Sequence, residues 1–342
     1  MERKLASIQK ILEVLPHTNA DTLEIVKVLG WTCVVLKGQF VKDQQVVYIE
    51  PDAILPEGKE EWAFMKDRGF RIKTIKLRGQ VSQGLVFPIS IVDDTFFRIQ
   101  AEAGTLQDGV DVTEMLGITK YEPYVPAQLA GTVKGNFPEF VHKTDEMRIQ
   151  AVPEVLYRHQ QKPFYVTEKV DGSSMTVYIK DGEFGVCSRN LDLKETESNS
   201  LWKVARELDL ENKLRSYRRN IALQGELLGP GVQGNKYKLD KLNYLLFNVF
   251  NIDTGLHFDY PDFVQVIEYL GLPHVPFITN SYILPATVDE LVEYSKGKSL
   301  LNKDVHREGV VFRPIVNEYS EDLRGRLSFK CINPDFLLKY NE

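Results

Sequence analysis

The sequence is poor in cysteine and has no long apolar run. Its three cysteines, Cys33, Cys187 and Cys331, are far apart and form no Cys-x-x-Cys pair, which argues against a disulfide framework or a zinc site. No apolar segment approaches the about 18 residues that a membrane-spanning helix needs, and the first ten residues lack the apolar core of a secretory signal. These absences predict an intracellular protein that does not enter a membrane.

The chain also lacks a basic tail and any excess of positive charge, since its formal net charge is −6 over 342 residues. Contact with nucleic acid would therefore depend on a local cationic surface and not on bulk charge. With 43% hydrophobic and 26% charged residues, the composition is that of a globular protein and not of a disordered one. This length favours two domains.

Short β-rich runs separated by Gly or Pro dominate the first 120 residues. Four of these runs are KLASIQKILEVLP, GWTCVVLKGQF, QQVVYIEPDAILP and FRIKTIKLRGQVSQGLVFPIS, the last of which predicts two strands around a glycine turn. Strands of this length and spacing are typical of a small barrel. A stretch rich in Pro and Gly follows, and it predicts a linker at 126–140.

Strands and helices mix after this linker. The segment SLWKVARELDLENKLRSY has helical spacing, with apolar positions on roughly one side at Leu201, Val204, Ala205, Leu208 and Leu214. PDFVQVIEYLGL predicts a second helix, because Pro stands at its start and Gly at its end. The whole chain is therefore expected to be α+β.

One lysine stands out within a strand-like segment, YVTEKVDGSSMTVY. Lys169 lies two residues before Asp171, which is followed by Gly172. By itself this Lys-x-Asp-Gly pattern also fits a plain strand that ends in a turn. Five further segments downstream favour a functional interpretation: CSRN, LQGELLGP, YLLFNVFNI, REGVVFRP and RLSFKCIN.

In this order, these segments resemble the motifs of the covalent nucleotidyltransferase superfamily, which comprises DNA ligases, RNA ligases and mRNA capping enzymes. TEKVDGSS, GELLGP and EGVVFRP are most similar to RNA ligases, as is KTDEMRIQ ahead of the lysine. PHTNADTLEIVKVLGW is similar to the start of tRNA-binding OB domains. The resemblance implies an N-terminal OB-fold β-barrel at 1–125 and, at 141–342, a nucleotidyltransferase domain of antiparallel sheets with flanking helices.

The activity implied by this resemblance is that of an ATP-dependent RNA ligase that joins 3′-OH and 5′-phosphate ends. AMP would pass from ATP to Lys169 and then to the 5′-phosphate, before the 3′-OH displaces it. The implied cofactors are ATP and Mg²⁺ or Mn²⁺. The expected substrate is RNA with broken ends, as in a nicked duplex under repair, and we expect the protein to act as a monomer.

Lys169, Lys330 and Glu308 are the expected catalytic residues. A free lysine has a pKa of about 10.4 and is protonated at neutral pH. A nucleophilic lysine therefore needs burial or nearby cations, which lower its pKa. Lys330 and a divalent cation are expected to supply that positive field. The resemblance implies that Asp171, Glu226 and Glu308 hold the metal, largely through its water shell.

The resemblance also assigns contacts to the base and the sugar of the nucleotide. Glu226 is expected to contact the ribose, and Glu168, directly before the nucleophile, to contact the edge of the adenine. The aromatic residue that stacks on the adenine is best matched by Phe247, with Phe250 as the alternative.

Further polar residues are expected to contact the phosphates. Arg189 is a candidate for the ribose and phosphate, Arg148 for the β- and γ-phosphates, and Asn199 is a weaker candidate for the same two phosphates. The chain departs from the family pattern at its last motif, usually Lys-x-Lys, because Ser328 stands where the first lysine is expected. Arg326 is a candidate to replace that charge.

A dense group of cations lies in the expected OB domain, next to Phe70. Five cations fall within 11 residues: Arg68, Arg71, Lys73, Lys76 and Arg78. OB barrels bind nucleic acid through basic and aromatic side chains on one face, so these residues are expected to bind RNA. The alternative is a solvated edge strand that its charges protect from aggregation.

Two other functions remain open. A capping-type guanylyltransferase would share the lysine and most motifs, although only 12 residues follow Lys330, too few for the C-terminal OB domain common in those enzymes. A nucleic-acid-binding protein with an inactive transferase domain would be consistent with Ser328.

Overall fold

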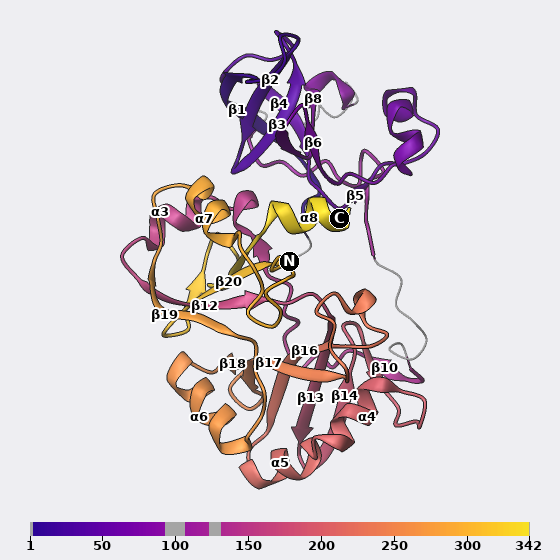
Figure 1. Ribbon diagram of the computed structural model, residues 1–342, viewed down its shortest axis with the longest axis vertical. Helices are drawn as coiled ribbons and strands as arrows, with labels where there is room; N and C mark the ends of the chain where they lie inside the picture. Colours follow the sequence, from indigo (N-terminus) through magenta and orange to yellow (C-terminus); the bar gives the residue numbers. More distant parts are fainter. Residues whose placement is uncertain (1–2, 93–106, 123–130, 342) are drawn as a thin grey trace. The chain divides into compact units, whose positions relative to one another are not determined.

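The computed structural model describes residues 3–92, 107–122 and 131–341 (Figure 1). The chain divides into two compact units. Unit 1 takes the chain up to residue 123, together with Ile149–Val155 and the segment from Pro334 onward, and unit 2 takes the remainder. The first part of the expected linker, up to residue 130, lies outside the described residues, whereas Val133–Asn136 forms a strand, β10.

Unit 1 is built on a five-stranded antiparallel sheet of order β3-β2-β1-β4-β8. Its strands are β1 (Ala6–Pro16), β2 (Leu23–Val28), β3 (Trp31–Leu36), β4 (Gln45–Ile49) and β8 (Leu85–Pro88). β1 pairs with β4 through its first half and with β2 through its second half, and a register shift separates Ile11 from Glu13. Such an irregularity bends a strand, so one long strand serves both halves of the curved sheet.

Smaller elements complete unit 1. They are the pair β5 (Ala53–Ile54) and β9 (Thr119–Lys120), the hairpin β6 (Thr74–Leu77) and β7 (Gln80–Gln83), the 3₁₀ helices η1 (Glu60–Arg68), η2 (Ile89–Ile91) and η3 (Ile149–Ala151), and α8 (Pro334–Tyr340). The segment from Phe70 that was expected to hold two strands holds three, β6 to β8. The additional break is at Gly84, whose φ of +92° is open to glycine but strained for other residues.

Unit 2 contains two main sheets. The seven-stranded sheet has the order β10-β15-β14-β13-β16-β17-β18, with β15 (Leu191–Leu193), β14 (Glu183–Cys187), β13 (Ser173–Lys180), β16 (Ile221–Leu228), β17 (Asn243–Asn251) and β18 (Leu256–His257). The five-stranded sheet has the order β11-β23-β20-β12-β19, with β11 (Met147–Arg148), β23 (Phe329–Ile332), β20 (Gly309–Pro314), β12 (Pro163–Lys169) and β19 (Phe277–Ile283). Only the β11–β23 pairing in these two sheets is parallel, which agrees with the antiparallel sheets expected from the sequence.

Helices cover one face of each sheet in unit 2. The helices are α3 (Glu154–His159), which begins in unit 1, α4 (Ser200–Glu207), α5 (Leu210–Tyr217), α6 (Tyr260–Leu270) and α7 (Val288–Ser295), and the remaining elements are η4 (Gln233–Asn235), β21 (Tyr319–Ser320) and β22 (Gly325–Arg326). α4, α5 and α6 pack on one face of the seven-stranded sheet (Figure 1). On the five-stranded sheet, Phe312 and Phe329 stack on each other at 5.1 Å and Tyr294 of α7 lies 6.1 Å from Phe312.

The helical segment from Ser200 to Tyr217 is two helices and not one. Asp209 adopts the left-handed conformation, with φ of 54°, and separates α4 from α5. Leu201 and Leu214 still reach the same core, while Leu208 at the junction is only partly buried. The predicted second helix is confirmed as α6, with Pro261 in its first turn and Gly271 as its C-cap.

All three cysteines are free and buried. Burial raises the pKa of Cys33 and of Cys331 to about 12, so these thiols stay protonated and are packing residues. Of the helices in the described parts of the chain, none combines the length and the apolar character that spanning a membrane requires.

Candidate active site

The centre of the candidate site is the ion pair between Lys169 and Glu308. Lys169 is the last residue of β12, and its Nζ lies 2.6 Å from Glu308 Oε1. The two residues are 139 positions apart in the sequence. They meet because β12 pairs with β20, so that Lys169 lies opposite Gly309, the neighbour of Glu308.

Two further carboxylates come from the chain that follows Lys169. Asp171 and Gly172 connect β12 to β13, and Glu226 of β16 is the register partner of Ser174. A Cβ atom on Gly172 would lie 2.4 Å from the Leu227 carbonyl oxygen and 2.8 Å from Glu226 Cγ. Only glycine therefore allows this close approach, which explains why the motif has glycine after Asp171.

The three carboxylates decide the charge of the lysine. Burial by itself would lower the pKa of Lys169, but Glu308, Glu226 and Asp171 outweigh it and raise that pKa above its ordinary value. Burial raises the pKa of Glu226 to about 8, with Lys169 opposing the shift and Glu308 and Asp171 adding to it. The Lys169 amine is therefore held in its protonated form by these carboxylates, and a protonated amine is not nucleophilic.

The carboxylates fit a hydrated divalent cation better than a directly coordinated one. Within the described residues, no set of three His, Cys, Asp or Glu side chains is placed to bind a metal by itself. Yet Asp171, Glu226 and Glu308 converge on one lysine, and Glu308 Oε2 is buried with no hydrogen-bond partner in the described part of the chain. Mg²⁺ usually keeps several of its waters, so these oxygens suit a cation that is held through its water shell.

Two expected phosphate ligands lie on the same sheet face as Lys169. Thr167, Val311 and Lys330 are register partners across β12, β20 and β23, and Arg148 of β11 pairs with Lys330. Side chains alternate along a strand, so Lys169, two residues from Thr167, shares the face of this row. The structure therefore places Lys330 and Arg148 on the same sheet face as Lys169.

A cation that the sequence interpretation missed lies in the next row of this face. Ser328, two residues before Lys330, is buried and its Oγ has no hydrogen-bond partner within the described residues. Continuing the β20–β23 register places Arg313 opposite Ser328. Arg313 is 2% exposed and its Nη2 donates to Glu146 Oε1 at 3.1 Å. The only signal in the sequence was the arginine five residues after Glu308 in REGVVFRP.

Arg326, which was expected to replace the missing lysine, donates hydrogen bonds to two asparagines. Its Nη1 donates to Asn248 Oδ1 at 2.7 Å and its Nε donates to Asn317 Oδ1 at 2.6 Å. Arg313, and not Arg326, is thus the guanidinium across from Ser328.

The two candidate stacking residues differ in their exposure. Phe247 is partly buried, and the guanidinium carbon of Arg313 lies 5.8 Å from the centre of its ring. Phe250 is 1% exposed and packs in a core cluster with Tyr178 and Cys187. Phe250 therefore has no ring face to offer, and Phe247 is the better candidate.

Glu168 lies on the opposite face of β12 from Lys169. Its carboxylate is 1% exposed, and its Oε2 accepts the Leu300 N–H at 2.7 Å. Its Oε1 is buried with no hydrogen-bond partner among the described residues. Burial raises the pKa of Glu168, opposed mainly by its hydrogen bonds to Ser299 and Leu300. The residue thus has one free acceptor for a ligand donor.

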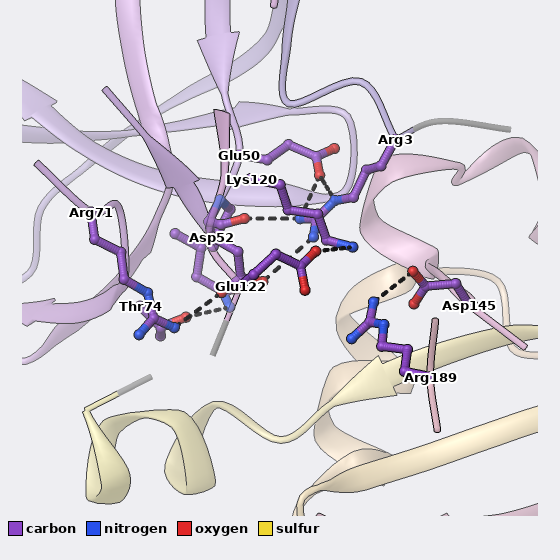
Figure 2. A network of polar contacts seen from close by, with 11 residues as sticks. Arg3, Glu50, Asp52, Arg71, Thr74, Lys120, Glu122, Asp145 and Arg189 are labelled. Atoms are coloured by element: carbon purple, nitrogen blue, oxygen red, sulfur yellow. Dashed lines mark hydrogen bonds and ion pairs between the residues drawn. The ribbon is translucent and has the colours of Figure 1, made fainter. Parts of the chain in front are cut away.

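Arg189 and Asn199 have different surroundings. Arg189 lies in the turn between β14 and β15, half-exposed, and pairs with Asp145 at 2.8 Å (Figure 2). Asn199 is 0% exposed, and its Oδ1 accepts the Trp202 N–H at 3.0 Å as the N-cap of α4. Arg189 can reach a ligand from solvent, whereas Asn199 Oδ1 caps α4 and Asn199 Nδ2 is buried with no hydrogen-bond partner within the described residues.

The five cations of unit 1 do not share one strand. Arg68 ends η1, Lys73 precedes β6, Lys76 lies in β6 and Arg78 in the turn that follows. Arg68, Lys76 and Arg78 are exposed. Arg71 instead pairs with Asp52 at 3.4 Å (Figure 2) and lies 3.5 Å from the ring centre of Tyr121. Because β6 covers only four residues of this segment, the cations are distributed over a helix end, a strand and a turn.

Comparison with known proteins gives matches over both units. A sequence model described as RNA ligase matches residues 162–332, and one described as an OB-fold domain matches residues 5–89, which confirms the OB fold predicted for the N-terminal part. No curated protein matches the chain.

Several solved structures of an RNA ligase from Naegleria gruberi are similar to the whole chain. One contains PPi; it is 37% identical, with a TM-score of 0.87, and the match covers 99% of each chain. Two mutants, one with ATP and Mn and one with AMP and Mn, are also 37% identical with TM-scores of 0.87 and 98% coverage of each chain. The α+β architecture expected from the sequence is therefore confirmed.

Proposed function

Because the chain belongs to the RNA ligase family, we propose that it is an ATP-dependent enzyme that joins 3′-OH and 5′-phosphate RNA ends through a covalent lysyl-AMP. The observation that carries this proposal is the enclosed Lys169, 2.6 Å from Glu308 and surrounded by Asp171 and Glu226. A lysine in this setting stays protonated until the charges of the neighbouring carboxylates are neutralised, and it can then act as a nucleophile.

In the first step, Lys169 Nζ attacks the α-phosphate of ATP. A P–N bond forms, the bond to the β-phosphate breaks, and pyrophosphate leaves. The 5′-phosphate of the RNA then attacks the same phosphorus and the lysine amine leaves. Finally, the 3′-OH attacks the activated RNA phosphate, which forms the phosphodiester and releases AMP.

The chain's own residues serve these steps through charge. A divalent cation held at Asp171, Glu226 and Glu308 would neutralise the carboxylates that keep the Lys169 amine protonated. Lys330 and Arg148 share the face of Lys169 and stabilise the negative charge that grows on the phosphates.

The carboxylate of Glu168 would favour adenine over guanine as the base that it contacts. The buried Glu168 Oε1 has no hydrogen-bond partner among the described residues, so it can accept from the 6-amino group of adenine. Guanine has a carbonyl oxygen at position 6, so two hydrogen-bond acceptors would face each other, which costs free energy. This arrangement supports ATP as the donor and not the GTP of a capping-type guanylyltransferase.

Labelled nucleotides test the proposal directly. Incubation with ATP or GTP carrying an α-phosphate label, plus Mg²⁺, should place AMP and not GMP on the protein. GMP on the protein would indicate a guanylyltransferase, and the absence of label from both would indicate an inactive domain. A panel of nicks in which each strand is RNA or DNA then defines which ends are sealed.

Replacing Phe247 with alanine should raise the KM for ATP. Base–aromatic stacking contributes about 1–3 kcal/mol, which corresponds to an increase of roughly 5- to 150-fold. The measurement is the ATP dependence of protein–AMP formation, with Phe247→Tyr as a control that keeps the stack. An unchanged KM in Phe247→Ala would remove this residue from the base site. Phe250→Ala should instead lower thermal stability, because Phe250 is a core residue.

Changing Arg68, Lys76 and Arg78 together to alanine should weaken nick binding while protein–AMP formation stays unchanged. For every phosphate that the variant no longer binds, the slope of log affinity against log salt concentration should become shallower by about 0.7–0.9. Nick affinity is measured across a series of salt concentrations with the full-length protein. A truncated protein that starts at about residue 130 is not used for this measurement. It would retain Ile149–Val155 and the segment from Pro334 without the rest of unit 1, to which they belong.

The matched control changes Lys37, Lys42 and Lys59 to alanine, which removes the same charge from other exposed positions of unit 1. If both triple variants reduce nick affinity equally, the effect comes from overall charge. If neither does, the cations at 68, 76 and 78 do not bind the nick.

A further inference from the structure

Lys236 belongs to the carboxylate cluster around Lys169, although its sequence context indicated no role. It lies in the loop between β16 and β17, and its Nζ forms an ion pair with Asp171 Oδ2. The two side chains are only 12% and 13% exposed. An exposed ion pair between a lysine and a carboxylate contributes little to stability. The Lys236–Asp171 pair is instead largely buried and lies at the candidate metal site.

The neighbouring residue, Tyr237, fixes the position of this loop. Tyr237 is 2% exposed, and its hydroxyl accepts the Asp171 backbone N–H at 2.8 Å. Its carbonyl accepts the Asn302 Nδ2–H at 2.9 Å. These contacts tie the loop to Asp171 and to the segment that precedes Glu308, so that Lys236 is held beside Asp171.

The cluster pairs each of two ammonium groups with one carboxylate. Lys169 contacts Glu308, and Lys236 contacts Asp171. An ammonium group on a carboxylate oxygen takes the place that a cation or its water shell would occupy. A divalent cation near Asp171 would also be repelled by this charge, because two like charges a few ångströms apart in an enclosed site repel strongly.

We propose that Lys236 is an internal counter-cation that competes with the divalent cation for Asp171 and thereby sets the metal concentration at which the site loads. This inference rests on the metal site of the proposed function. It gives the β16–β17 loop a purpose: the loop keeps Asp171 neutralised and ordered in the absence of metal, and Lys236 gives way when the metal is bound.

The test is direct binding of Mn²⁺ to the full-length protein in the absence of ATP and RNA, followed by the decrease of the free-ion electron paramagnetic resonance signal. Lys236→Met keeps the length of the side chain but removes its charge, and it should bind Mn²⁺ roughly tenfold more tightly than the wild type. Lys236→Arg should stay close to the wild type. Lys238→Met, at an exposed position two residues away, controls for the removal of a charge outside the cluster.

A merely structural lysine would give the opposite result. If Lys236 only holds Asp171 in place, its removal leaves Mn²⁺ affinity unchanged or weaker, and either outcome overturns the proposal. So does the absence of Mn²⁺ binding in all variants. In an Asp171→Asn background the difference between lysine and methionine at 236 should disappear, and its persistence would point to another ligand.

The metal-binding result does not depend on ligase activity. A chain that forms no protein–AMP but shows the tighter Mn²⁺ binding of Lys236→Met would refute the proposed function alone. A chain that forms protein–AMP but shows no such change would refute this inference alone. Thermal melting of each variant confirms that the fold is intact.

Discussion

Lys169→Ala is expected to abolish the formation of a covalent protein–AMP adduct. No other amine in the described residues lies in the same position, 2.6 Å from Glu308 and enclosed by two further carboxylates. Because the adduct is the first intermediate of the proposed reaction, nick sealing from unadenylylated RNA ends must stop as well. The measurement is label from ATP on the protein, with the modified residue located by mass spectrometry.

The matched control is Lys203→Ala on the exposed side of α4, which should label like the wild type. An RNA substrate that already carries AMP on its 5′-phosphate bypasses the first two steps, so Lys169→Ala should still seal it to some extent. Label on another lysine, or full labelling of Lys169→Ala, would show that the nucleophile lies elsewhere.

Glu308→Gln is expected to lower the rate of protein–AMP formation by roughly 10²-fold or more at saturating Mg²⁺, the usual cost of removing one group that stabilises charge in a transition state. Two effects oppose each other in this variant. Removing the carboxylate removes the main attraction that raises the pKa of Lys169, so more of the amine should be neutral. It also removes one of the three carboxylates proposed to hold the metal, and this second effect is expected to dominate.

The pH profile separates these two effects. If the carboxylate acts only by holding the proton on Lys169, Glu308→Gln should be faster than the wild type at neutral pH. If it acts through the metal, the rate falls at every pH and the Mg²⁺ requirement increases. Glu207→Gln, at an exposed position at the end of α4, is the control for the removal of a charge, and near-wild-type labelling by Glu308→Gln would contradict the metal role.

The architecture and the centre of the site were predictable because both depend on local patterns. The strands of the N-terminal part, the helix α6 and the α+β class follow from apolar spacing, glycine and proline. Lys169, Asp171 and Gly172 lie within four consecutive residues, and Gly172 has a steric reason for its place. A reaction that requires particular residue types close together in the sequence can be recognised from the sequence alone.

Positions that depend on long-range packing were not predictable. The sequence did not show that Asn199 is fully buried or that its Oδ1 caps α4. The sequence also did not show that Arg71 contacts Asp52 and Tyr121. The sequence gives the identity of a polar residue, but only the fold shows whether that residue is exposed or is buried and paired.

The sequence by itself determined the family, the order of the motifs and the candidate nucleophile, since covalent chemistry requires a lysine beside carboxylates in a fixed local arrangement. The tertiary structure alone decided which distant charges join that lysine. Arg313 lies across from Ser328 because of the β20–β23 register, and Lys236 reaches Asp171 over 65 residues because Tyr237 anchors its loop. Strand register and loop path result from the packing of the whole unit, and short sequence patterns do not specify them.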